Sequence, residues 1–332
     1  MDSKRPHKYR ALKQICSILC ILLITSCTWV EDDVDNCPYG FWLNLHYTYN
    51  ILDVEAAPEY ISEVAVYVYD ADGNYVSRLD VPQSVLKANG HRVRVEGLPE
   101  GDYQFVVWSG IGNSTYAVSG DRGALNQFRL SLAQPELKVA SCLPDLYYGK
   151  LQTVHYDDSY VLHDVYMMKN TNQLACLVVP MSDDATLSPD DYDMKVVTAN
   201  SVMDAHNMLV SDNEMTYEPF VRNSVTFEDA EYGELNGVSF NISTLRLMED
   251  KDCRLILEKK DSGETIFNIS FPEYIGMIGT LYTNLGRQLT VQEYLDRQDF
   301  YTIVFFLSSD LNQLVQLQVN SWRLRAKNHI KL

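Results

Sequence analysis

Between residues 41 and 49 the chain alternates strictly between two sets of side chains. Every second residue is apolar or aromatic, namely Phe41, Leu43, Leu45, Tyr47 and Tyr49. The residues between them are Trp42, Asn44, His46 and Thr48. A period of two is typical of a half-buried β-strand, because successive side chains of a strand point to opposite faces of the sheet. We therefore expect a strand over residues 41–50.

The same alternation recurs along the chain between turn-forming segments. It recurs at residues 64–68, before a turn at 70–74, and again at 92–95, before a turn at 98–102. Short strands separated by turns, with few helical stripes, favour an all-β fold made of β-sandwiches. One helix is expected at residues 290–298, because Thr290 and Glu293 form a capping box at its start.

The length of the chain and a weak internal sequence similarity predict two related domains. Residues 98–103 and 187–192 both place a turn and an Asp-Tyr pair ahead of an apolar strand. A chain of about this length corresponds to roughly two domains. Residues 151–160 are polar and are interpreted as the connection between the domains. We therefore expect an N-terminal β-sandwich at 37–152 and a C-terminal β-sandwich at 160–332.

The first 27 residues have the pattern of a bacterial lipoprotein signal. Basic residues come first (Lys4, Arg5, Lys8, Arg10 and Lys13), an apolar run covers 15–24, and small residues precede Cys27. Such a pattern predicts a signal peptide, and its apolar run is too short to span a bilayer as a helix. We expect a signal peptide at 1–26 and Cys27 as the lipidated first residue of the mature chain. An ordinary cleaved signal with an incidental cysteine is the alternative.

A short acidic segment follows the cysteine. Residues 27–36 include Glu31, Asp32, Asp33 and Asp35 and few apolar residues, so we expect a flexible tether. An acidic stretch at this place resembles the surface-export signal of Bacteroidota lipoproteins. The resemblance implies a lipid-anchored, surface-exposed protein of the outer membrane.

The charge balance excludes one class of partner. The net charge is −18, and removing the basic signal peptide brings it near −22. Such an acidic chain does not bind nucleic acid through charge, because the phosphate backbone attracts basic surfaces.

The cysteines leave their pairing open. Beyond Cys27 the chain has Cys37, Cys142, Cys176 and Cys253, and four cysteines allow three connectivities. If each domain closes its own bridge, the pairs are Cys37–Cys142 and Cys176–Cys253. Four buried thiols are the alternative. No CxxC or CxxC…HxxxH spacing occurs, so we expect no zinc site.

No motif indicates catalysis, a cofactor or a metal. The segment 70–74 resembles a calcium loop, but its sixth position is Tyr75 and its twelfth is Val81, so a hairpin turn fits better. Gly110-Ile111-Gly112 lacks the third glycine of a dinucleotide site, and GxSxG and HExxH do not occur. Surface aromatics such as Trp42, Trp108 and Tyr116 could stack on sugars, although aromatics in β-rich chains usually pack cores. We expect no enzymatic activity.

The C-terminal residues alternate between basic and mostly apolar side chains. Arg323, Arg325 and Lys327 belong to the basic stripe. As a strand, this segment would either form a solvated edge of its own sheet or add to a sheet of another subunit.

Several segments, taken in their order along the chain, resemble those of the Bacteroidales fimbrial anchor lipoproteins, the anchor subunits associated with fimbrillins. They include residues 37–50, 66–73, 98–108, 187–197, 215–219, 245–247, 292–297 and 319–322, so they run through almost the whole mature chain. Their order and combination carry the resemblance, because none is a catalytic motif.

The resemblance implies a fold, a partner and a role. The fold would be two tandem transthyretin-like β-sandwich domains with a minor helix. The partner would be a major or minor fimbrillin, bound by strand addition, and the role would be to attach the fimbrium to the cell and influence its length. Related fimbrillins exchange a donor strand after proteolysis removes an N-terminal strand. Here that cut would also remove the lipid, so we expect residues 41–50 to stay in place. A surface glycan-binding lipoprotein is the alternative function.

Overall fold

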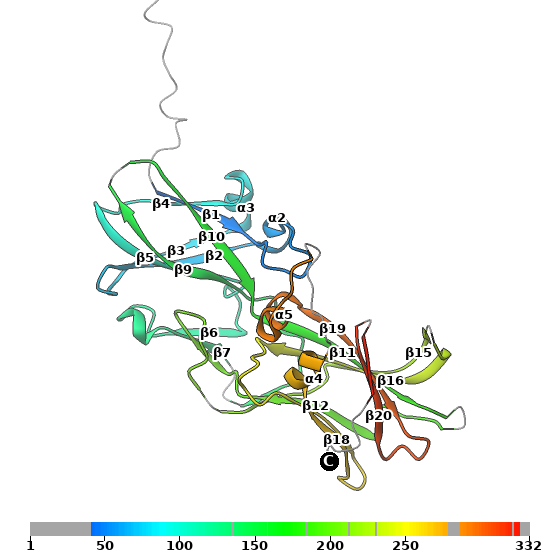
Figure 1. Cartoon of the computed structure of the whole chain (residues 1–332). Helices are drawn as coiled ribbons and strands as arrows, with labels where there is room; N and C mark the ends of the chain where they lie inside the picture. Colours follow the sequence, from blue (N-terminus) through cyan, green and yellow to red (C-terminus); the bar gives the residue numbers. More distant parts are fainter. Residues whose placement is uncertain are drawn as a thin grey trace, which may run out of the picture. The chain divides into compact units, whose positions relative to one another are not determined.

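The computed structural model describes residues 41–133, 136–157, 159–182, 185–211, 213–229, 231–277, 286–320 and 322–325, all within the unit Gly40–Leu332. Strands predominate in these residues and form sheets of seven, six, five and three strands (Figure 1). The predicted all-β class is therefore confirmed. The transthyretin-like description stays a prediction.

The seven-stranded sheet has the order β3-β2-β5-β9-β10-β1-β4. Its strands are β1 (Phe41–His46), β2 (Val64–Asp70), β3 (Tyr75–Val81), β4 (Arg92–Val95), β5 (Gly101–Ser109), β9 (Tyr147–Tyr156) and β10 (Val161–Lys169). β1 runs parallel to β10 and antiparallel to β4. Two short helices, α2 (Ala57–Tyr60) and α3 (Gln83–Ala88), lie in the connections after β1 and β3.

The alternation along β1 has the predicted structural consequence. Phe41, Leu43 and Leu45 are buried, whereas the residues between them are half-buried. The buried residues join a core with Ala57 of α2 and Leu86 of α3. The strand expected from residue 41 onward is therefore confirmed, although β1 ends at His46 and the following residues form a loop.

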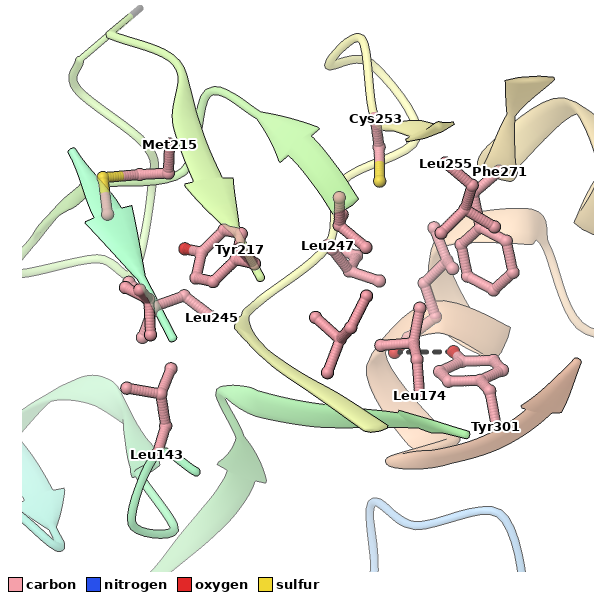
Figure 2. Close-up of a cluster of buried hydrophobic side chains, with 14 of the residues drawn as sticks. Leu143, Leu174, Met215, Tyr217, Leu245, Leu247, Cys253, Leu255, Phe271 and Tyr301 are labelled. Carbon is pink, nitrogen blue, oxygen red and sulfur yellow. Dashed lines mark hydrogen bonds between the residues drawn. The ribbon is translucent and has the colours of Figure 1, made fainter. Parts of the chain in front are cut away.

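The two C-terminal sheets enclose the largest core. The six-stranded sheet has the order β15-β16-β11-β19-β20-β21, and the five-stranded sheet β18-β17-β12-β14-β8. Their strands are β8 (Lys138–Val139), β11 (Thr171–Pro180), β12 (Tyr192–Thr198), β14 (Met215–Tyr217), β15 (Val221–Asp229), β16 (Gly233–Leu245), β17 (Arg254–Lys259), β18 (Thr265–Ser270), β19 (Phe300–Leu307), β20 (Leu314–Val319) and β21 (Trp322–Arg325). Figure 2 shows part of this core, where Leu174, Leu255 and Phe271 gather near Tyr301.

A three-stranded sheet mixes strands from the two halves of the sequence. It contains β6 (Tyr116–Ser119), β7 (Arg129–Leu132) and β13 (Val202–Asp204), with the short 3-10 helix η3 (Leu125–Gln127) before β7. β13 pairs with β7, and β8 pairs with β14, so strands before residue 140 pair with strands after residue 200. Trp108 and Tyr116 are both buried in the core beside them.

The chain passes from the seven-stranded sheet to the six-stranded sheet at Asn170. Residues 151–160, expected to connect two domains, instead contain the end of β9 and the turn into β10, and both strands belong to the seven-stranded sheet. β10 ends at Lys169, and β11 begins the six-stranded sheet at Thr171. The buried Asn170 between them exchanges two amide hydrogen bonds with Asn207. The division into domains at 37–152 and 160–332 stays a prediction, with strand pairing favouring a boundary at Asn170.

Two helices lie beside the C-terminal sheets, α4 (Phe271–Met277) and α5 (Val291–Arg297). The helix expected at 290–298 is confirmed as α5, and the Thr290 hydroxyl accepts a hydrogen bond from the Glu293 N–H at its start. The Glu293 carboxylate binds Arg287. Among the described residues, no helix is long and apolar enough to cross a membrane.

The segment 70–74 is a hairpin turn between β2 and β3, as expected. The Asp70 carboxylate accepts hydrogen bonds from the N–H groups of Asp72 and Asn74, which closes the turn. Gly110 serves a different turn, after β5. Its φ is +88°, and a Cβ atom there would lie 2.0 Å from the carbonyl oxygen of Asp145. Only glycine fits this turn without displacing the neighbouring backbone.

Candidate functional site

β1 is an internal strand of its sheet. It pairs with β10 along all six of its residues and with β4 along four. The ring of Phe41 stacks on Phe105 of β5 at 4.8 Å between centroids. Because both strand edges of β1 are occupied and one face is buried, displacing it would open the core that it shares with α2 and α3.

The loop that follows β1 is held by an arginine from α5. The Arg297 Nη1 atom lies 2.6 Å from an oxygen of Asp53 and donates a second hydrogen bond to the Asn50 carbonyl at 3.1 Å. The guanidinium also covers the Tyr49 ring, 4.1 Å from its centroid. The side chains of Arg297 and Asp53 are only 8% and 11% exposed.

Neighbouring charges fasten the same region. Asp296, the residue before Arg297, receives two hydrogen bonds from Arg246, at 2.8 and 2.9 Å. Lys169, at the end of β10, forms ion pairs with Asp145 and Asp299. Burial lowers the pKa of Lys169, but the two carboxylates outweigh it and hold that pKa above its ordinary value. Arg297, Arg246 and Lys169 thus form ion pairs around α5 and the start of β19. Two of these pairs, Arg297 with Asp53 and Lys169 with Asp145, join the two halves of the sequence.

His46 lies between two carboxylates on the exposed face of β1. Its Nδ1 atom is 2.7 Å from Glu55, and its Nε2 atom is 3.0 Å from Asp164 on β10. Burial lowers the pKa of His46, but these hydrogen bonds and charges outweigh it and raise the pKa above its ordinary value. Glu55 also accepts the N–H groups of Tyr47 and Ala57, so the imidazolium helps to hold the loop after β1.

This geometry predicts a pH-dependent stability. Because folding raises the pKa of His46, its contribution is complete below the unfolded pKa of about 6.5 and is lost as the pH rises through the folded value. We expect the melting temperature to decrease as the pH rises from about 6 to 8. His46→Gln should make this decrease with pH smaller. Thermal unfolding across this range measures it. The exposed His206→Gln is the control, and an unchanged slope in His46→Gln would contradict the prediction.

A cleft of about 650 Å³ adjoins these groups. Thr48, Tyr49 and Asp53 of the loop after β1 line it, together with residues of β9 and β10 and Arg297 of α5. Two atoms in its wall, Asp53 Oδ2 and Arg297 Nε, are buried and lack a hydrogen-bond partner in the described structure. Neither here nor elsewhere in the described residues are three His, Cys, Asp or Glu side chains grouped to hold a metal ion.

The described cysteines differ in how deeply they are buried. Cys142 is exposed, while Cys176 and Cys253 are free and fully buried in the C-terminal core. In the structure Cys176 and Cys253 are not bridged to each other, and the pairing of the four cysteines stays a prediction. Burial raises the pKa of Cys253 to about 12, which disfavours its reactive thiolate. Cys27 and Cys37 lie outside the described residues, so lipidation and a Cys37–Cys142 bridge stay predictions.

The basic C-terminal segment begins on the last strand of a sheet, as far as the described residues show. Arg323 and Arg325 lie on β21, which pairs with β20 and is the last strand of the six-stranded sheet. Lys327 lies outside the described residues. Both readings of this segment, a solvated edge and a strand that adds to another subunit, require such an edge.

Sequence reasoning missed the ion pairs of Arg297 and the His46 cluster. Asp53 and Arg297 are 244 positions apart, and His46 and Asp164 are 118 apart. The sequence alternation from residue 41 onward did predict that His46 faces away from the core. No local pattern shows which residue of a distant segment lies opposite it.

The family comparison agrees with the segments that carried the sequence resemblance. A model of the family described as fimbrillin-A associated anchor proteins Mfa1 and Mfa2 matches residues 34–328. No curated protein matches the chain.

Solved structures from Bacteroidales share the fold. A candidate polysaccharide-binding protein of Bacteroides thetaiotaomicron is 28% identical, with a TM-score of 0.73, and the match covers 86% of this chain and 98% of that one. A candidate adhesin of the same species is 25% identical, with a TM-score of 0.76 and coverages of 88% and 99%. The fimbrial anchor protein Mfa2 of Porphyromonas gingivalis is 17% identical, with a TM-score of 0.63 and coverages of 88% and 100%, which supports the fold.

Proposed function

Because the chain belongs to the family of fimbrillin-A associated anchor proteins Mfa1 and Mfa2, we propose that it anchors a fimbrium to the outer membrane. A fimbria-associated role follows from the family itself, whose model covers most of the chain. The proposal adds three elements to this role, which are a lipid at Cys27, a retained first strand and a contact with fimbrillin at a sheet edge.

The lipid would hold the protein close to the membrane. Cys27 follows a basic segment and an apolar run, and Phe41, the start of β1, is 14 residues further on. A fully extended chain of this length reaches at most about 50 Å. A fimbrium held by this protein would therefore stay near the outer surface of the cell without any membrane-spanning segment.

The internal position of β1 carries the proposal that the first strand is retained. Both edges of β1 are paired, and the loop after it is fastened through Asp53 to Arg297. The family resemblance implies that a polymerising fimbrillin vacates a strand position to accept the next subunit. An anchor that keeps β1 keeps its lipid and accepts no subunit at that position, so it would end the polymer at the cell and influence its length.

The contact with fimbrillin is proposed at the C-terminal edge of the six-stranded sheet. Among the described residues β21 is the last strand of its sheet, and on the side away from β20 its N–H and C=O groups pair with no described strand, so they are available to another chain. Residues 323–332 alternate basic and mostly apolar side chains, a pattern suited to pairing across two subunits.

Deleting residues 323–332 tests this contact. We expect fimbrillin to be lost from material purified with the deleted chain, because the deletion removes both the edge strand and its basic side chains. Co-purification from the native host, followed by immunoblotting for fimbrillin, measures it. A full-length chain with Arg323→Gln, Arg325→Gln and Lys327→Gln separates the role of the strand from that of its charge. Full recovery of fimbrillin with the deleted chain would place the contact elsewhere.

A further inference from the structure

The seven-stranded sheet has an exposed face that takes no part in the proposed contact with fimbrillin. It is formed by every second residue of three adjacent strands: Trp42, Asn44 and His46 of β1, Leu162, Asp164 and Tyr166 of β10, and Arg92 and Arg94 of β4. Strand register places Trp42 beside Leu162 and Arg94, and His46 beside Tyr166. The residues between them face the core, so these side chains share the opposite face. We call it the β10–β1–β4 face.

Aromatic rings on this face are held by planar polar groups. The Arg94 guanidinium lies 5.9 Å from the centre of the Trp42 ring. The Tyr166 ring stacks on His46 at 5.4 Å with an interplanar angle of 24°, and Tyr166 remains 49% exposed. His46 is itself fixed by Glu55 and Asp164. Tyr166 is thus an exposed but oriented ring rather than a loose surface side chain.

Hydrogen-bonding groups lie between the rings. Asn44 donates to Asp164 at 2.8 Å, and this pair stands between Trp42 and Tyr166 in the register of the two strands. From Trp42 to His46 the face extends about 13 Å along β1. Rings at both ends with amide and carboxylate groups between them form a surface that is neither purely apolar nor purely charged.

The face continues into the cleft described above. Tyr166 belongs to both, because it lines the cleft together with Thr48, Tyr49 and Lys150. Tyr49 is held in place by the Arg297 guanidinium over its ring. The cleft volume of about 650 Å³ lies within the range of small-ligand sites, which combine apolar walls with a few placed polar groups.

We propose that the β10–β1–β4 face and the adjoining cleft bind a polysaccharide chain. A sugar ring presents C–H groups on its faces, which pack on aromatic rings, and hydroxyl groups at its rim, which bond to amide and carboxylate groups. A row of oriented rings with such groups between them matches an extended saccharide.

Other occupants fit the face less well. A protein strand cannot add to β1 or β10, because both are already paired on both sides, and a strand added at β4, the last strand in the described order, would extend the sheet without covering this face. Nucleic acid is disfavoured by the net charge of −18. The inference is independent of the fimbrial contact, which involves the C-terminal sheet edge.

Affinity electrophoresis of the full chain tests the proposal. The chain, solubilised in detergent, is run in native gels that contain yeast mannan, dextran or polygalacturonate. We expect slower migration in at least one of these gels. Tyr166→Ala should weaken that binding about tenfold, whereas Tyr166→Phe keeps the ring and should retain it. Lys150→Ala, an exposed residue of the cleft, should also weaken it.

The controls separate this site from folding and from anchoring. Tyr232→Ala removes a partly exposed tyrosine of the β15–β16 hairpin and should leave binding unchanged. Fimbriae should stay on cells that carry Tyr166→Ala, because the anchor contact is elsewhere. Unchanged migration in all three gels, or equal retardation of Tyr166→Ala and the natural chain, would overturn the proposal.

Discussion

Replacing Cys27 by alanine is expected to move fimbrillin from the cells into the culture medium while total fimbrillin stays unchanged. The substitution removes the only thiol at the predicted lipidation position. Each buried CH2 of an acyl chain contributes about 0.8 kcal/mol to membrane binding, so losing the lipid removes the entire membrane attachment of the proposed anchor. Polymerised fimbrillin would still form, because the contact between subunits is untouched.

The measurement is an immunoblot of fimbrillin in washed cells and in the medium of the native host. Cys142→Ala is the matched control, because Cys142 is exposed in the described structure and lies far along the chain from the signal. We expect this control to keep fimbriae on the cells. Fimbriae that remain firmly bound to cells carrying Cys27→Ala would contradict the lipid anchor and leave the surface role to be explained by another attachment.

Replacing Arg297 by alanine is expected to lower the free energy of unfolding by about 3–5 kcal/mol. The change leaves the carboxylate of Asp53 nearly buried without its cation, and removing one partner of a buried ion pair has a cost of this size. It also removes the hydrogen bond to Asn50 and the guanidinium that covers Tyr49. The loop after β1 would lose its main attachment to α5.

Urea unfolding of the purified chain measures this effect. Arg78→Ala is the matched control, because Arg78 pairs with Asp80 on the surface, where an ion pair contributes about 0–1 kcal/mol. Combining Arg297→Leu with Asp53→Asn should recover part of the loss, since no unpaired charge then remains. A loss of less than about 1 kcal/mol in Arg297→Ala would show that the pair behaves as a surface contact.

Local patterns were sufficient where a structure depends on neighbours in the sequence. The period of two from residue 41 onward predicted the buried face of β1, because a strand buries alternate residues whatever its partner is. Thr290 and Glu293 predicted the start of α5, since a helix cap needs only the first turn. The turn at 70–74 was predicted for the same reason, because Asp70 closes it with its own neighbours.

The connection expected at 151–160 shows the limit of local reasoning about domain boundaries. The segment is polar because it lies at the exposed end of a hairpin, and its residues 151–156 belong to β9. Polar side chains in a segment indicate that it is exposed to water. They do not by themselves indicate a domain boundary. The change of sheet lies instead at the buried Asn170, whose amide is satisfied by Asn207.

By itself, the sequence determined the all-β class, the faces of its strands and the family, because these depend on the order and period of side chains. Only the tertiary structure decided that β1 is internal, that Arg297 holds the loop after it, and that Tyr166 and Tyr49 share one cleft. The pairing of β1 with β10, the contact of Arg297 with the loop and the shared cleft join residues more than 100 positions apart, and strand register and the packing of α5 bring them together. An ion pair or a cleft of this kind has no local periodicity, so it appears only when the sheets are assembled.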